Sequence, residues 1–379
     1  MKISVLCFDL SDNAAGRAHL LARLLAPIAE VEVIGPREGP GIWAPVAADG
    51  VRYVAWPGGR LPRFVRTLPA LLRAADGDLL YASKPRLGSA GIGHLKRLLG
   101  RRPLLLDIDD WEVGFFLRGG AWGTLGRAFN LSNPRGLPWT WLMERAARAA
   151  DGITVASRFL QERFGGVLIP HVRDTDAWRP GMTDPGEIRK RLGVDDRRVV
   201  MFLGTAREHK GVDDLAAAVE DLRRPDLALV LVGTDPRSHG GRRLLARHPG
   251  LRLVPPIPFA EVPRYMEAAD VIAVPQRDSP DTRGQVPAKL FDAMALARPI
   301  VSTRVSMIPE ILEGCGMVVP PGDPAALGAA IARLADDRTL AGELGARARV
   351  RCVERYSFTA ARRDLFPLVM GLARRPAHR

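Results

Sequence analysis

The chain has 379 residues, a length that predicts two domains, or three, at roughly 100–200 residues per domain. Hydrophobic residues make up 47% and charged residues 26%, which excludes a disordered or a fibrous chain. The formal net charge is +13, and only 6 of the 55 basic residues are lysines. Such an arginine excess is typical of a GC-rich coding sequence, so the charge by itself does not indicate a nucleic-acid partner.

Three cysteines, Cys7, Cys315 and Cys352, lie far apart and form no Cys-x-x-Cys pair. Neither a disulfide framework nor a zinc site is therefore expected. The apolar run at the N-terminus is short and ends at Asp9, and no stretch of ~18 apolar residues occurs. We expect a cytoplasmic protein that does not span a membrane, with peripheral contact at the inner face of the membrane as the alternative.

Short apolar runs alternate with longer helical patterns along the chain. In the first half they predict strands near 2–8, 31–34, 51–55, 79–82, 103–107, 152–156 and 167–169, with helices near 16–25, 60–75, 89–99 and 139–150. The alternation restarts at about residue 198. It predicts strands near 198–203, 227–232, 251–253, 271–274 and 300–302, with helices near 213–222, 259–268, 287–297 and 323–355. Continuous apolar strands indicate parallel sheets that are covered on both faces.

The stretch 170–196 contains several prolines and glycines without a sustained period, so we place the domain boundary there. We predict an N-terminal domain over 1–178, a C-terminal domain over 179–356, and a C-terminal helix over 357–379 that crosses back to the first domain. The predicted fold class is α/β, with two doubly wound Rossmann-like domains facing a cleft. Ligands of such sheets bind at the carboxyl ends of the strands, at the topological switch point.

A glycine opens the first predicted helix, in the segment DLSDNAAGRAHLLARLL. Gly16 and Arg17 would lie at a helix N-terminus, which attracts anions. An ordinary turn at Gly16 with a solvated Arg17 is the alternative. The segment is not a Gly-x-Gly-x-x-Gly fingerprint, so it does not support a nicotinamide cofactor.

The segment LGTAREHKG, residues 203–211, connects a buried strand to a helix. Arg207 and Lys210 could bracket a diphosphate there, with a planar guanidinium and a compact ammonium. They would neutralise the charge that develops on a leaving phosphate, which is where electrostatic catalysis acts. A solvated capping turn is the alternative.

A third segment, GQVPAKLFDAMALARPIVSTR, covers residues 284–304. Gln285, Val286 and Pro287 would open a helix whose free N–H groups suit a phosphate, and Asp292 on that helix could hold ribose hydroxyls. Lys289 and Asp292 are three residues apart, so a surface salt bridge is the alternative.

Residues 52–102 carry eleven basic residues and only Asp76 and Asp78 as acids. Within them, RLPRFVRTLPALLRAA predicts an amphipathic helix with apolar residues at positions 61, 64, 65, 68, 71 and 72, which Pro69 should kink or divide. One interpretation is a core-facing helix with a solvated basic rim. The other is contact with an anionic membrane surface. Nucleic acid is not expected, because no reader motif is found.

These segments together resemble the family-four retaining glycosyltransferases of the GT-B fold. LGTAREHKG, LVLVGTDP, IPFAEVPRYMEAADVIAVP and PAKLFDAMALARPIVST follow the order of that family's nucleotide-sugar domain. NAAGRA resembles its glycine-rich acceptor loop, and VASRFLQERFGGVLIPHVRDTDAWRP resembles its hinge. The resemblance implies a donor site that comprises Gly16, Gly204, Thr205, Gly233, Ile257, Gln285, Val286, Lys289 and Asp292.

The sequence departs from the family pattern at three positions of the donor site. The first glutamate of the family's Glu-x(7)-Glu motif falls on Gly284, whereas the second falls on Asp292, which is shorter by one methylene. The usual phosphate-binding arginine falls on Thr205, and Arg207 is its expected substitute. The resemblance thus implies Arg207 and Lys210 as catalytic residues.

Four acidic residues end the strand in PLLLDIDDWE, namely Asp107, Asp109, Asp110 and Glu112. The triplet Asp107-Ile108-Asp109 has the form of a metal-binding Asp-x-Asp, but the resemblance implies transfer without a metal and so predicts no metal ligand. Asp109 is expected as a third catalytic residue, close to the donor sugar. Arg17 and Asp110 are expected on the acceptor side.

The resemblance implies that a sugar moves from a nucleoside diphosphate donor to a hydroxyl of a small-molecule acceptor, with retention of configuration. No cofactor is expected; the donor is a co-substrate, and a UDP-sugar is favoured. The alternatives are a membrane-surface enzyme with a lipid acceptor, a degenerate protein that binds nucleotide-sugar without transferring it, and a sugar-nucleotide epimerase.

Overall fold

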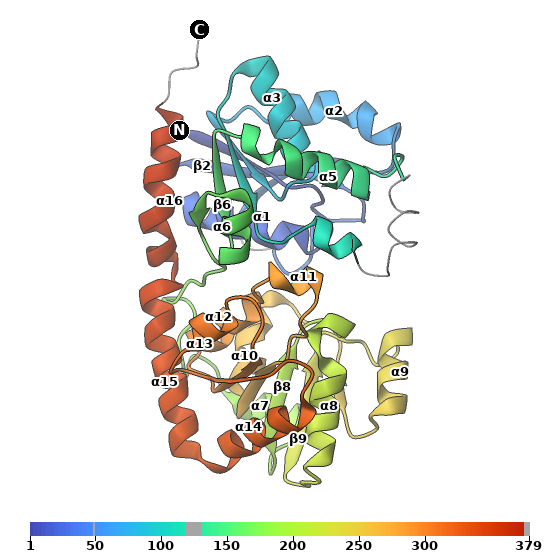
Figure 1. Ribbon diagram of the computed structural model, residues 1–379, viewed down its shortest axis with the longest axis vertical. Coiled ribbons are helices and arrows are strands. Elements are labelled where there is room, and N and C mark those ends of the chain that lie inside the picture. The colour runs from blue at the N-terminus through green and yellow to red at the C-terminus, as the bar shows by residue number, and fades with distance from the viewer. Residues whose placement is uncertain (48–49, 118–129, 375–379) are drawn as a thin grey trace. The chain divides into compact units, whose positions relative to one another are not determined.

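The computed structural model describes residues 1–47, 50–117 and 130–374 (Figure 1). The chain forms two units, one of Met1–Pro170 with Ala361–Arg379 and one of His171–Ala360. Each unit is built on one parallel sheet. The predicted α/β class with two doubly wound, Rossmann-like domains is confirmed.

The first unit has seven strands in the order β3-β2-β1-β4-β5-β6-β7. The order reverses between β1 and β4, which makes this pair the switch point. The strands are β1 (Lys2–Leu6), β2 (Glu30–Arg37), β3 (Arg52–Pro57), β4 (Leu79–Ser83), β5 (Leu104–Ile108), β6 (Gly152–Val155) and β7 (Val167–Leu168). The helices are α1 (Ala14–Leu25), α2 (Arg63–Ala74), α3 (Ile92–Gly100), α5 (Leu137–Ala146) and α6 (Arg158–Phe164), with short turns at Leu87–Gly91, Val113–Phe116 and Ala147–Ala149.

The last helix, α16 (Phe358–Ala373), packs against this sheet from Ala361 onward. Its side chains Leu365, Val369 and Leu372 are buried. A Cβ on Gly152 would lie 3.2 Å from Leu372 Cδ1, so the small residue at the start of β6 lets the helix approach closely. The C-terminal helix therefore completes the core of the N-terminal unit.

The second unit has six strands in the order β10-β9-β8-β11-β12-β13. Its switch point lies between β8 and β11. The strands are β8 (Arg198–Leu203), β9 (Leu227–Val232), β10 (Arg252–Val254), β11 (Val271–Val274), β12 (Ile300–Thr303) and β13 (Met317–Val319). The helices are α7 (Pro185–Leu192), α8 (Val212–Asp221), α9 (His239–Arg247), α10 (Val262–Glu267), α11 (Pro280–Arg283), α12 (Ala288–Ala295), α13 (Ile308–Leu312), α14 (Pro324–Asp336) and α15 (Arg338–Arg355), with short turns at Glu208–Lys210 and Phe259–Glu261.

Two predicted helices differ from the observed ones. The helix expected over 323–355 is divided into α14 and α15, because Asp337 leaves the helical conformation and its side chain accepts a hydrogen bond from the Leu340 N–H. Pro69, expected to kink or divide its helix, does not end α2. It takes away the hydrogen-bond donor to the carbonyl of Val65, a residue that is exposed. No helix in the described ranges is both long and apolar enough to cross a membrane.

Candidate functional site

Two glycines stand at the switch point of the second unit, directly after β8 and β9. Gly204 has φ +129° and Gly233 has φ +106°, a region that disfavours side chains. A Cβ on Gly233 would lie 2.9 Å from the carbonyl carbon of Gly204, so the two backbones touch. The ends of β8 and β9 thus meet without a side chain of their own between them, and this position beside Gly204 is here called the Gly204 opening.

Two ammonium groups converge on this opening. A Cβ on Gly204 would lie 2.6 Å from Lys289 Nζ and 3.5 Å from Lys210 Nζ. Lys210 comes from the turn after β8, and Lys289 comes from the first turn of α12. Like charges that are held together in this way favour an anion between or beside them. The structure therefore brings together Gly204 and Lys289, which were predicted to bind the donor, and Lys210, which was predicted to be catalytic.

The Lys289 side chain extends across an aromatic ring. Its Nζ lies 4.1 Å from the centroid of the Phe202 ring on β8. Burial lowers the pKa of Lys289 well below its ordinary value, and the charge of Lys210 lowers this pKa further, whereas Asp292 opposes both. An anion at the opening would reverse the shift because it favours the charged ammonium.

Asp292 lies one turn along α12 and is buried. Its carboxylate accepts a hydrogen bond from Arg173 Nε. Burial raises the pKa of Asp292, and the Arg173 charge opposes this rise. The Arg173 guanidinium in turn lies 5.6 Å from the Trp178 ring centroid and 5.4 Å from that of Phe259. Asp292 is thus not the partner of a surface lysine, and its ribose role stays a prediction.

The turn Glu208–Lys210, which carries Lys210, is held in place by contacts with the segment after β11. His209 is buried, with its ring nitrogen 3.7 Å from an Asp281 carboxylate oxygen, and its carbonyl accepts a hydrogen bond from the Arg277 N–H at 2.9 Å. Gly211 has φ +62°, and a Cβ there would overlap the carbonyl oxygen of Pro275. Arg207, by contrast, is exposed at the start of the turn. A rigid base therefore carries Lys210, while Arg207 points into solvent.

Four more predicted donor residues belong to the second unit. Thr205 is exposed, Ile257 is half-buried in the loop after β10, and Val286 is buried between α11 and α12. The Gln285 N–H donates to the Thr282 carbonyl at 3.1 Å. Of the three residues expected to open the helix, Pro287 is its N-cap, whereas Gln285 and Val286 precede the helix, because α12 begins at Ala288.

In the first unit, Arg17 on α1 is a buried residue with four hydrogen bonds. Its guanidinium donates to both carboxylate oxygens of Asp107, at 2.9 and 2.8 Å, and to the carbonyls of Ile169 and Pro170. This network ties α1 to the end of β5 and to the chain after β7. The neighbouring Gly16 faces Trp43, whose ring would lie 3.1 Å from an added Cβ. The solvated Arg17 of the alternative interpretation is not observed.

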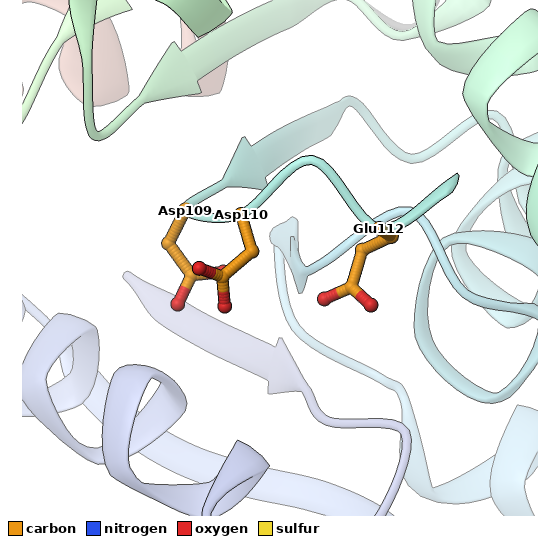
Figure 2. Close-up of side chains that lie close together, drawn as sticks. All are labelled: Asp109, Asp110 and Glu112. Atoms are coloured by element: carbon orange, nitrogen blue, oxygen red, sulfur yellow. The ribbon is translucent and has the colours of Figure 1, made fainter. Parts of the chain in front are cut away.

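Asp109, Asp110 and Glu112 form a separate cluster (Figure 2). Lys84 pairs with all three carboxylates. Lys84 Nζ lies 2.8 Å from Asp109 Oδ1, 2.6 Å from Asp110 Oδ2 and 3.0 Å from Glu112 Oε1. Burial raises the pKa of Asp109 to about 7, against the effect of the Lys84 charge. The three carboxylates offer the oxygen ligands that a divalent cation prefers, but Lys84 already supplies a positive charge there.

The two aspartates of the Asp-x-Asp triplet, which was not expected to bind a metal, have different partners. Asp107 faces Arg17, whereas Asp109 faces Lys84. Because side chains alternate along a strand, residues 107 and 109 would share one face if the strand continued. Asp109 follows the end of β5 at Ile108, so this alternation no longer determines where its side chain lies. The cluster that could bind a metal therefore contains Asp110 and Glu112 in place of Asp107.

Two arginines flank Phe8, directly after β1. The guanidinium carbons of Arg86 and Arg135 lie 5.4 and 5.2 Å from its ring centroid. Arg86 pairs with Glu112, and Arg135 pairs with Asp9. Phe8, Arg86 and Arg135 also line a pocket of the first unit. The switch point of this unit is thus polar, with both signs of charge.

Two family models match the chain. One, described as "Glycosyl transferase 4-like domain", matches residues 14–175, and the other, "Glycosyl transferases group 1", matches residues 197–337. A GDP-mannose-dependent alpha-(1-6)-phosphatidylinositol monomannoside mannosyltransferase of Mycolicibacterium smegmatis is 30% identical over 303 residues, which are 74% of this chain and 73% of that protein. The chain belongs to the group 1 glycosyltransferases.

Other relatives of this glycosyltransferase have different names. An alpha-maltose-1-phosphate synthase of Mycolicibacterium smegmatis is 28% identical over 70% of this chain and 72% of its own length. An alpha-D-kanosaminyltransferase of Streptomyces kanamyceticus is 26% identical over 50% of this chain and 48% of its own length. The relatives therefore share the family but not one substrate.

Solved structures confirm the GT-B fold of the glycosyltransferase. HepE of Anabaena, in complex with UDP-glucose, has a TM-score of 0.77 at 19% identity and covers 98% of this chain and 100% of that one. WaaG, a glycosyltransferase involved in lipopolysaccharide biosynthesis, has a TM-score of 0.67 at 14% identity and covers 96% of this chain and 100% of that one.

Sequence reasoning missed several residues of both switch points in this glycosyltransferase. Lys84, Arg86 and Arg135 belong to no recognisable sequence motif. Arg173 lies within the hinge segment, but no role was predicted for it. Gln276, just after β11, is only 2% exposed, and neither polar atom of its side chain has a hydrogen-bond partner in the described ranges. A polar residue directly after a buried strand beside the switch point was the available signal for Gln276.

Proposed function

We propose that the protein transfers a sugar from a nucleoside diphosphate sugar to a hydroxyl of a small-molecule acceptor, with retention of configuration and without a metal ion or cofactor. Its group 1 membership supports glycosyl transfer. The convergence of Lys210 and Lys289 on the Gly204 opening is the observation that supports a diphosphate donor. Two cations at a switch point supply the charge that a metal would otherwise bring.

In this proposal the bond between the anomeric carbon and the diphosphate oxygen breaks while the acceptor oxygen attacks from the same face. The acceptor proton passes to the departing diphosphate oxygen, so no enzyme nucleophile is required. Lys210 and Lys289 stabilise the negative charge on the leaving diphosphate. Their effect is greatest in the transition state, because the charge on that oxygen grows as the bond breaks.

The donor base is the open part of this proposal. We favour a UDP-sugar, and a GDP-sugar is the competitor because the 30% identical relative from Mycolicibacterium smegmatis is named as GDP-mannose-dependent. Asp292 would accept the ribose hydroxyls from within its pair with Arg173. Arg207, in an exposed position beside the turn, would reach the diphosphate once the donor is bound.

On the acceptor side we propose Asp109 and Asp110 as groups near the reacting sugar, and Arg17 as the residue that holds α1 in place there. A membrane lipid is the second candidate acceptor, since the same relative acts on a phosphatidylinositol monomannoside by its name. The acidic cluster favours a neutral polyhydroxylated or amine-bearing acceptor over an anionic headgroup.

The proposal is tested by a thermal-shift panel of nucleoside diphosphates and nucleotide sugars, followed by product analysis with the donor that binds. A ligand that binds only the folded state raises the melting temperature by mass action. Retention is read from the anomeric configuration of the product, and chelator must leave transfer intact. Donor binding without transfer to any acceptor would indicate a degenerate binder. A change in the donor sugar without an acceptor would indicate an epimerase.

A further inference from the structure

The last turn of α3 exposes two leucines. Leu98 is 75% and Leu99 is 70% exposed, more than any other large hydrophobic side chain in the described ranges. The helix ends at Gly100, and Arg101 adopts a left-handed conformation with φ +52°. Single exposed leucines are common on protein surfaces, but two neighbouring ones at the tip of a helix are costly in water.

The leucine tip lies beside α2. The two helices are in contact and lie next to each other in the first unit (Figure 1). Lys96 Nζ on α3 donates to the carbonyl of Leu72 on α2 at 2.8 Å. Residues three apart share one side of a helix, so Leu99 lies on the side of α3 from which Lys96 reaches the end of α2, whereas Leu98 lies on another side of the same last turn.

The outer side of α2 is basic. Phe64 and Leu71 point into the core, which agrees with a core-facing helix. Val65, expected among the buried apolar positions, is instead 53% exposed. The exposed side also carries Arg63, Arg66 and Arg73. Most apolar side chains of α2 therefore pack in the core, whereas Val65 is exposed among the arginines.

Part of the positive charge of residues 52–102 is compensated within the unit. Lys84 and Arg86 are buried among carboxylates, and Arg97 pairs with Asp151. On α2 and just before it the charge is left uncompensated: within the described part of the chain, no carboxylate pairs with the guanidinium groups of Arg60, Arg63, Arg66 and Arg73. A partner that neutralises them must carry negative charge.

We propose that this surface, which comprises Arg60, Arg63, Val65, Arg66, Arg73, Leu98 and Leu99, docks on an anionic lipid bilayer. The leucine tip would enter the boundary between headgroups and acyl chains, while the arginines bind anionic headgroups. An anionic bilayer suits both the exposed leucines and the arginines, since it has an apolar interior under a negatively charged surface. The inference concerns where the enzyme is held and does not depend on its donor or acceptor.

The test is co-sedimentation of the full chain, without substrate, with vesicles of pure phosphatidylcholine and of phosphatidylcholine with phosphatidylglycerol. We expect binding to the anionic vesicles alone, and weaker binding when salt is raised from ~0.01 M to ~0.15 M, because the Debye length shortens from about 30 to 8 Å. L98S/L99S should weaken binding about tenfold or more, since the variant lacks the two apolar side chains that would enter the bilayer. R63Q/R66Q should weaken it by at least about tenfold as well.

The matched control is V350S/V353S on α15, where two exposed valines also lie among arginines but in the second unit. This variant should bind vesicles like the wild type. Equal melting temperatures show that all variants are folded, and equal donor thermal shifts separate this inference from the proposed function. Wild-type protein that ignores anionic vesicles overturns the inference. So does a chain that dimerises through this surface, seen as a dimer in light scattering that L98S/L99S dissociates without any vesicle binding.

Discussion

The ammonium of Lys289 lies above the ring of Phe202 and reaches the same opening as Lys210. An ammonium over an aromatic face is stabilised as a cation, but burial and Lys210 disfavour its charge. A bound diphosphate would resolve this conflict. The relationship makes Lys289 the residue whose charge should depend most on the donor.

We expect Lys289→Ala to lower kcat by about 10²–10³, the usual effect of removing one electrostatic donor from a transition state. Lys210→Ala should have a similar effect. Steady-state kinetics with the donor from the thermal-shift panel measure both. Lys190→Ala, at an exposed lysine of α7, is the control and should behave as wild type. Unchanged kinetics in Lys289→Ala would remove this residue from the donor site.

Donor binding should weaken as pH rises through the lowered pKa of Lys289, because the ammonium then loses the charge that binds the diphosphate. The folding stability of the donor-free protein should change with pH in the opposite direction. The folded-state pKa is below the unfolded one, so the unfolded chain binds more protons between them and stability rises with pH across that window. Lys289→Met cannot titrate and should lose both dependences, measured by calorimetry and by denaturant unfolding.

Gly204→Ala should abolish donor binding while the protein still folds. A methyl group there takes the space of the Lys289 ammonium, and the φ of +129° costs a non-glycine residue about 1–3 kcal/mol. Gly250→Ala is the matched control, since nothing lies within 4 Å of its added Cβ. A Gly204→Ala protein that retains the wild-type thermal shift with donor would show that the opening is not the site.

Arg173 and Asp292 should be strongly coupled in stability. Arg173→Met leaves the buried carboxylate unpaired, which should cost about 3–5 kcal/mol. Adding Asp292→Asn should restore much of this loss, because the amide carries no charge. Denaturant unfolding of the two single variants and the double variant measures the coupling. Additive effects in this cycle would mean that the pair does not exist in solution.

Asp292→Asn alone should weaken nucleotide binding by about 1–3 kcal/mol, the range for hydrogen bonds to charged groups. Titration of the nucleoside diphosphate by calorimetry measures the loss. A complex in which Asp292 points away from the ribose would contradict the assignment.

Removing Lys84 should convert the acidic cluster into a metal site. In Lys84→Met, the three carboxylates lose the ammonium that they share, although Arg86 still pairs with Glu112. The variant should therefore be less stable than wild type and should be stabilised by calcium or manganese. Wild-type protein should show no such shift, and Lys190→Met is the control. Thermal melting with and without the metal decides it. A wild-type enzyme that requires the metal for transfer would overturn the metal-free proposal.

The predicted βαβ pattern and the observed sheets agree because burial on both faces of a parallel sheet leaves continuous apolar runs in the sequence. β4 and β5 are examples, with every residue buried. The break between α14 and α15 was not predicted, since the apolar period continues across Asp337 and only its backbone conformation ends the helix.

The sequence by itself determined the fold class, the family and the turn that carries Lys210, because these depend on local periodicity and on residues close together in the chain. The tertiary structure alone decided which charges are paired. Asp107 faces Arg17 across 90 residues, and Arg173 faces Asp292 across 119. It also decided which apolar residues stay exposed, as at Leu98 and Leu99. Pairing and exposure depend on distances between segments remote in sequence, which local patterns do not encode.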